Sequence, residues 1–101
     1  MSHRFRAPLW RHTGAAAWWF ITVPIDIADE IEFRTAGQRR GFGSVRVDAH
    51  VGDTSWRTSI FPDRATSSYL LPVKKAVRLA EGLLDEGVIV EVELSVLEEM
   101  L

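Results

Sequence analysis

A strict alternation of apolar and polar residues in two segments constrains the fold most strongly. Residues 41–51 alternate, and the apolar positions there are Val45, Val47, Ala49 and Val51. Residues 88–97 show the same pattern, with valine and leucine alternating with glutamate and serine. Because successive side chains of a strand point to opposite faces, both segments are predicted to be strands with one buried face. Such strands must share one core in a chain of 101 residues, so we expect a single domain over residues 1–101.

Four other segments are predicted to be strands because bulky and β-branched residues dominate them. They cover residues 5–10, 16–23, 54–61 and 69–71. A glycine and an aspartate at 52–53 join the third of these to the preceding alternating segment, which predicts a hairpin. We expect the tryptophans of these strands, Trp18, Trp19 and Trp56, to lie in the core; the alternative is that one of them forms the floor of a ligand pocket.

A helix is predicted after each of two prolines, because proline ends a strand and fixes the backbone of a first helical turn. Pro24 precedes the first helix and Pro72 the second. A glycine then follows each helix, Gly41 in the first half and Gly87 in the second, and leads into an alternating strand. This repeat predicts a pseudo-twofold fold of the α+β class. We expect a small, mainly β barrel of six strands, each half covered by one short helix.

Three blocks of sequence carry a family resemblance, namely residues 40–47 (RGFGSVRV), 56–63 (WRTSIFPD) and 69–78 (YLLPVKKAVR). In wording, order and spacing they resemble the bacterial family called domain of unknown function 1905, and the resemblance extends over nearly the whole chain. It implies a double-split β-barrel, a fold shared with swapped-hairpin DNA-binding regulators and antitoxins. It implies no established activity, so the function has to be argued from the residues.

Charge is distributed unevenly along the chain, although the formal net charge is only −2. Residues 34–78 contain nine basic and three acidic residues, whereas residues 79–101 contain seven acidic residues and no basic one. The sequence therefore predicts a basic middle and an acidic end. One interpretation is that the two segments partly neutralise each other across the sheet.

The second interpretation is an anion site centred on Lys74 and Lys75. Both lysines are predicted in the first turn of the second helix, where the helix dipole disfavours cations. Two ammonium groups beside free helix N–H groups would bind a phosphate or a carboxylate. Arg57 and Ser59 on the return strand of the hairpin, residues 54–61, are expected to add a guanidinium group and a hydroxyl, and Arg78 lies one turn beyond Lys74.

Other arrangements of the same residues remain open at this point. The two lysines can instead pair with Glu91 or Glu93 of the last strand. His50 and Asp48 lie two positions apart on one strand face and can form a histidine–carboxylate pair that acts as a base. The three histidines are scattered and the chain has no cysteine, so we expect no metal site, no disulfide and no thiol chemistry.

The function that these residues favour is a non-catalytic binding module for a small anionic ligand or an acidic protein partner, without a cofactor. The alternatives are a nucleic-acid-binding or antitoxin-like regulator, suggested by fold analogy alone, and a small enzyme that uses His50 with Asp48 or Glu91. The acidic last strand disfavours nucleic acid if it shares a face with the basic residues. The apolar run 15–25 is too short to span a bilayer and no export signal is evident, so we expect a cytoplasmic protein. The barrel can close within one chain or across a dimer, so we expect a monomer or a homodimer.

Overall fold

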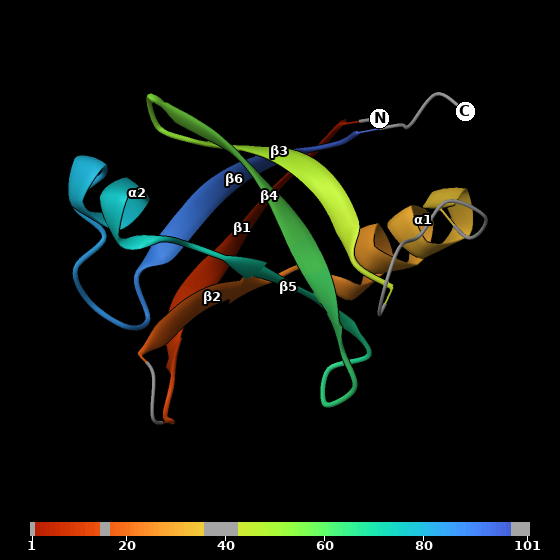
Figure 1. The fold of residues 1–101 in the computed structure, drawn as a ribbon, viewed down its shortest axis with the longest axis horizontal. Coiled ribbons are helices and arrows are strands. Elements are labelled where there is room, and N and C mark those ends of the chain that lie inside the picture. Colours follow the sequence, from red (N-terminus) through yellow and green to blue (C-terminus); the bar gives the residue numbers. More distant parts are fainter. Residues whose placement is uncertain (1, 15–16, 36–42, 98–101) are drawn as a thin grey trace.

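The computed structural model describes residues 2–14, 17–35 and 43–97, and these residues form six strands and two helices (Figure 1). The elements are, in chain order, β1 (Ser2–His12), β2 (Trp18–Thr22), α1 (Ile25–Thr35), β3 (Val45–Val51), β4 (Thr54–Asp63), β5 (Ser68–Pro72), α2 (Lys75–Ala80) and β6 (Ile89–Val96). The predicted strands and helices are therefore confirmed in number and order within the described residues. Neither described helix is long and apolar enough to cross a membrane.

The strands close into an antiparallel barrel in the order β1-β2-β5-β4-β3-β6, which confirms the predicted fold class. Exchanging β1 with β4, β2 with β5 and β3 with β6 turns every neighbouring pair into a pair that is also neighbouring, so the ring has the expected pseudo-twofold topology. The helices α1 and α2 follow equivalent strands and lie at opposite ends of the barrel (Figure 1). The ring closes within one chain.

The two halves are related by a shift of 50 positions. The amide of Val23 donates to the Tyr69 carbonyl and the amide of Val73 donates to the Trp19 carbonyl, each over 2.9 Å. The two helices also begin 50 positions apart, at residues 25 and 75. Both observations match the exchange of β2 with β5.

The predicted superposition of Pro24 on Pro72 was therefore wrong by two positions, since these prolines are 48 residues apart. Pro72 is the last residue of β5 and pairs with Phe20 of β2. The position equivalent to Pro24 is Lys74, which caps α2 in an extended conformation. The second helix thus begins later than expected, because Pro72 is still part of β5 and occupies its last position, where the missing N–H of proline is tolerated.

The core is the barrel interior, filled by alternate residues of each strand. The largest side chains with almost no exposed surface are Leu9, Ile21, Ile31, Ile60, Leu71, Leu94, Val23, Val47, Val77 and Val92. The helices α1 and α2 contribute Ile31 and Val77, which cover the two ends of the barrel. The period-2 pattern of the sequence is therefore the pattern of inward and outward side chains.

Pairing around the ring leaves a split beside β4. The residues of β4 from Thr54 to Ile60 pair with β3, whereas only Phe61, Pro62 and Asp63 pair with β5. On this side, the residues of β4 from Thr54 to Ile60 have no partner in β5, because the chain continues after Pro72 into α2. The split between the first half of β4 and α2 is where the candidate site lies.

A carboxylate holds α2 against the turn between β3 and β4. Glu81, the C-cap of α2, accepts hydrogen bonds from the Thr54 hydroxyl over 2.6 Å and from the Asp53 amide over 3.3 Å. The predicted turn at 52–53 is confirmed, with Gly52 in the left-handed region at φ 58°. Gly41 lies outside the described residues, whereas Gly87 adopts φ 90° in the turn before β6.

Candidate functional site

A pocket of about 820 Å³ opens in the split between β4, the start of β2 and the β5–α2 connection. Its aromatic lining residues are Trp18, Trp19, Trp56 and Phe61. Its basic lining residues are Arg57, Lys74, Lys75 and Arg78. The pocket thus combines an aromatic wall with cationic side chains from β4 and from the β5–α2 segment. We refer to it as the cationic pocket.

Four of the five predicted site residues lie together in this pocket, and Ser59 does not. Ser59 is half-buried in β4, where it pairs with Arg46 of β3. Its neighbours Thr58 and Phe61 line the pocket, but the serine itself is not part of the lining. Lys74, Lys75 and Arg78 come from one short segment, and the packing of α2 beside β4 brings Arg57 to the same pocket.

Arg57 is held at the rim by an ion pair. Its Nε lies 3.0 Å from Oδ1 of Asp48, the residue directly opposite it in the β3–β4 register. Both side chains are well exposed, so the pair contributes little to stability, about 0–1 kcal/mol. Its effect is to orient the guanidinium, which has five N–H donors and uses one of them here.

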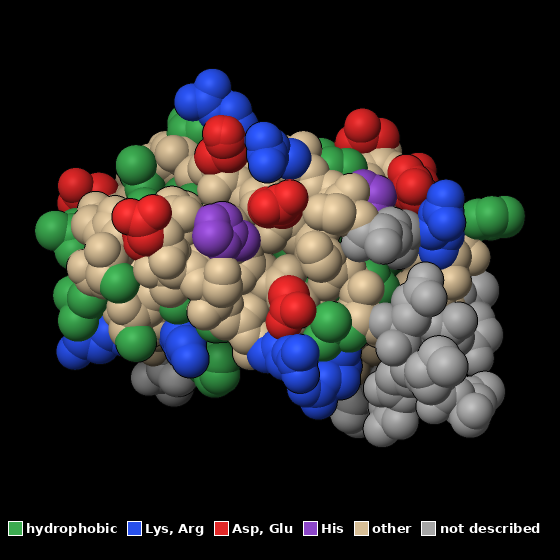
Figure 2. Space-filling view, turned by 90° about the horizontal axis from the view of Figure 1, so that it is seen from above, with side chains coloured by type: hydrophobic (Ala, Val, Ile, Leu, Met, Phe, Trp, Pro, Cys, Tyr) green, Lys and Arg blue, Asp and Glu red, His purple; other side chains and the backbone are tan. Residues whose placement is uncertain are grey.

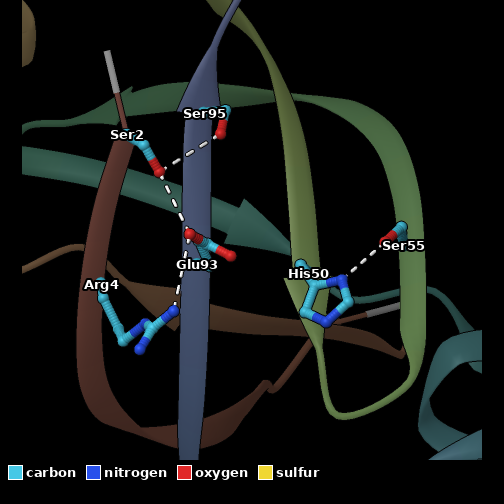
Figure 3. Close-up of polar contacts among 6 residues, drawn as sticks. All are labelled: Ser2, Arg4, His50, Ser55, Glu93 and Ser95. Atoms are coloured by element: carbon cyan, nitrogen blue, oxygen red, sulfur yellow. Dashed lines mark hydrogen bonds and ion pairs between the residues drawn. The ribbon is translucent and has the colours of Figure 1, made fainter.

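The predicted pairing of His50 with Asp48 is wrong. Asp48 contacts Arg57, and His50 Nδ1 lies 2.6 Å from the hydroxyl oxygen of Ser55, its partner across the hairpin (Figure 3). Cross-strand neighbours lie closer together than alternate residues of one strand, so each side chain finds its partner on β4. The His50–Ser55 pair lines a separate open hollow of about 460 Å³, and it does not line the cationic pocket.

Arg78 lies over a tryptophan of the pocket. Its guanidinium carbon is 4.8 Å from the centroid of the Trp19 ring, and its Nε donates to the Val73 carbonyl over 3.2 Å. A guanidinium in this position is attracted by the face of the indole. The two contacts fix the arginine and cover one part of the Trp19 ring.

Lys74 and Lys75 are exposed, and within the described residues neither makes an ion pair with a carboxylate. Glu93 instead lies 3.7 Å from Arg4 of β1 and accepts a hydrogen bond from Ser2 (Figure 3). The expected alternative, in which the lysines pair with Glu91 or Glu93, is therefore wrong. The reason is the order of the ring, which puts β6 between β1 and β3, on the side of the barrel away from β5.

The acidic strand β6 is paired with β3 of the basic segment 34–78, but it is not a neighbour of β4 or β5. The acidic side chains of β6 do not line the cationic pocket. The face seen in Figure 2 carries acidic, basic and histidine side chains side by side. Because α2 has only six residues, its dipole is small, and the positive character of the pocket comes from the four side chains.

The aromatic wall agrees with the alternative in which a tryptophan lines a ligand pocket, and not with the expectation that all three tryptophans lie in the core. Trp56 is buried as predicted, but Trp18 is 55% exposed and Trp19 only partly buried, so the core assignment of Trp18 was wrong. Adjacent residues of a strand point to opposite faces, so Trp18 and Trp19 cannot both face the interior. That rule was available from the sequence and indicates an exposed tryptophan.

The comparisons with known proteins identify a family. The family model described as "Domain of unknown function (DUF1905)" matches residues 5–94, nearly the whole chain, including every residue of the cationic pocket. No curated protein matches the chain. Within the described ranges, His, Asp and Glu side chains do not gather in groups of three that could hold a metal ion. The match shows that the chain belongs to the DUF1905 family.

Proposed function

We propose that this protein is a non-catalytic binding module that takes a small anionic ligand in the cationic pocket. The observation that carries the proposal is the convergence of Arg57, Lys74, Lys75 and Arg78 on one hollow of about 820 Å³. This volume is in the range of small-molecule sites, about 300–1,000 Å³. Among the described residues of the pocket, Arg57 is the cation with a carboxylate partner. The other three positive charges are available to a phosphate or carboxylate.

The affinity of the pocket for an anion is expected to fall as the salt concentration rises. Lys74 and Lys75 are exposed, so their attraction for an anion is screened as the ionic strength rises. Arg78 is partly buried against Trp19, and its contribution is less sensitive to salt. A ligand that uses all of them loses part of its affinity between low and moderate salt.

A thermal-shift screen at two salt concentrations tests the proposal, with inorganic phosphate, organic acids, nucleotides and short DNA as probes. A probe at 100 times its Kd stabilises the folded state by about 2.7 kcal/mol. For a domain of this size that is an increase in Tm of several degrees. We expect such an increase from small anions, and we expect the double variant Lys74→Ala/Lys75→Ala to abolish it.

The matched control is the double variant Arg6→Ala/Arg46→Ala, which removes the same charge from exposed positions that do not line the pocket. The control should retain the shift of the native protein. Equal losses in both double variants would mean that the anions respond to overall charge and would contradict the proposal. A screen without any shift, or a shift from short DNA alone, would also contradict it.

A further inference from the structure

We infer that the ligand of the cationic pocket carries a planar aromatic ring that lies against Trp18, while its anionic group contacts Lys74 and Lys75. This inference rests on the proposed function and names the ligand class for the same pocket. It follows from which aromatic surfaces of the wall are covered by the protein and which are not.

Most of the aromatic wall is already in contact with protein groups. Trp56 is buried in the barrel, so little of its ring reaches the pocket. One part of the Trp19 ring is covered by the Arg78 guanidinium. Trp18 differs, since 55% of its surface is exposed.

One side of the Trp18 ring is stacked on Phe20, with the centroids 6.3 Å apart and the planes inclined by 10°. Phe20 lines a neighbouring hollow and does not line the cationic pocket, whereas Trp18 lines both. The indole of Trp18 therefore offers the cationic pocket a surface that Phe20 does not cover. Phe61, also exposed, lines both hollows beside it.

The stack with Phe20 also fixes the orientation of this exposed ring. The ring centroids of Phe20 and Trp10 are 5.2 Å apart, and the Trp10 indole N–H donates to the Thr22 hydroxyl over 3.0 Å. Trp18 is thus the last member of a row of aromatic side chains anchored on β1 and β2. A rigid, partly exposed ring of this kind stacks on a flat ligand at a small loss of side-chain entropy.

The charges determine which way the ligand lies. The four cations of the pocket come from β4 and the α2 side, whereas the charged or titratable groups of the neighbouring hollow are His12 and Asp63. An anionic group is therefore favoured beside α2, and the ring end is favoured beside Trp18 and Phe61. Nucleotides and aryl carboxylates share this chemistry, a flat ring joined to an anion.

The test compares probes that differ in one group. Its probes are AMP, 1-naphthoate, ribose 5-phosphate, inorganic phosphate and adenosine, titrated into ¹⁵N-labelled protein. Stacking on an aromatic side chain raises affinity by about 10-fold or more. We expect AMP or 1-naphthoate to bind at least about 10-fold more tightly than ribose 5-phosphate, phosphate or adenosine. If AMP binds and 1-naphthoate does not, the ligand is nucleotide-like; the reverse result indicates an aryl carboxylate.

The indole N–H signals report the position of the ring. The Trp18 and Trp19 signals should shift with AMP or 1-naphthoate, and the Trp10 signal should not, because its N–H is bonded to Thr22 outside the pocket. The variant Trp18→Leu keeps an apolar side chain and should lower the affinity for the aromatic anion to that of ribose 5-phosphate. The control is Phe33→Leu on α1, whose ring is 85% exposed and does not line the pocket.

Two negative results have different meanings. If ribose 5-phosphate binds as tightly as AMP and 1-naphthoate, and Trp18→Leu has no effect, the ring inference is overturned while the anion site stands. If neither phosphate nor any aromatic anion binds, the proposed function fails and the inference fails with it. Unchanged unfolding midpoints for Trp18→Leu and Phe33→Leu establish that both variants are folded.

Discussion

Alanine at Ile21 or at Leu71 is expected to lower the free energy of unfolding by about 2–5 kcal/mol. These two side chains are paired across β2 and β5, and neither has exposed surface. They lie where the two halves of the pseudo-twofold barrel meet, so the surrounding strands cannot collapse into the space that either truncation leaves. A loss of this size is a large part of the total stability of a small domain, about 5–15 kcal/mol.

Urea unfolding of the variants measures this loss. The matched control is Leu79→Ala on α2, since Leu79 is 60% exposed and its truncation should change stability by about 0.5 kcal/mol or less. The double variant Ile21→Ala/Leu71→Ala should cost less than the two single losses added together, because the two truncations share one cavity. A similar loss for Leu79→Ala and Leu71→Ala would show that this pair is not the centre of the core.

Gly52→Ala is expected to destabilise the protein by about 2–4 kcal/mol, for two reasons that add. Gly52 adopts φ 58°, which a residue with a Cβ atom reaches only with strain. A Cβ atom at this position would also lie 1.9 Å from Oε1 of Glu81. The carboxylate would have to move, and its hydrogen bonds to Thr54 and Asp53 would be lost.

Gly82→Ala separates the two contributions. Gly82 has a similar φ of 67°, but a Cβ atom there meets no atom within 4 Å, so this variant should lose only about 1–2 kcal/mol. Chemical denaturation of both variants, repeated in a Glu81→Ala background, gives the contribution of the carboxylate. The difference between the two glycine variants should largely disappear in that background. If it persists, Glu81 does not hold α2 against the turn.

Local patterns predicted most of the secondary structure. The alternation in residues 41–51 and 88–97 predicted β3 and β6, and the glycine at 52 predicted the hairpin between β3 and β4. The errors are at the ends of elements, where a local rule competes with pairing. Pro72 was predicted to begin a helix, yet it completes β5, because its position at the end of the β2–β5 pair requires no N–H donor.

The candidate site was predictable only in part. Its basic residues could be selected because Lys74, Lys75 and Arg78 are concentrated in one short segment. The partner of Asp48 was predicted wrongly, although the predicted two-residue turn at 52–53 fixes the β3–β4 register and places Arg57 opposite Asp48. The exposed ring of Trp18 was not singled out, because the bulky residues of this strand favoured a largely buried strand.

The sequence by itself determined the six strands, the buried faces of the two alternating ones and the two helices, because side-chain periodicity and turn residues act within a few positions of the chain. The tertiary structure alone decided that β4 pairs with β5 over only three residues and that a pocket opens beside the rest of β4. It also decided that β6, with its glutamates, closes the ring between β1 and β3, away from Lys74 and Lys75. These features depend on contacts between residues distant in sequence, and such contacts form only when the whole ring closes around one core.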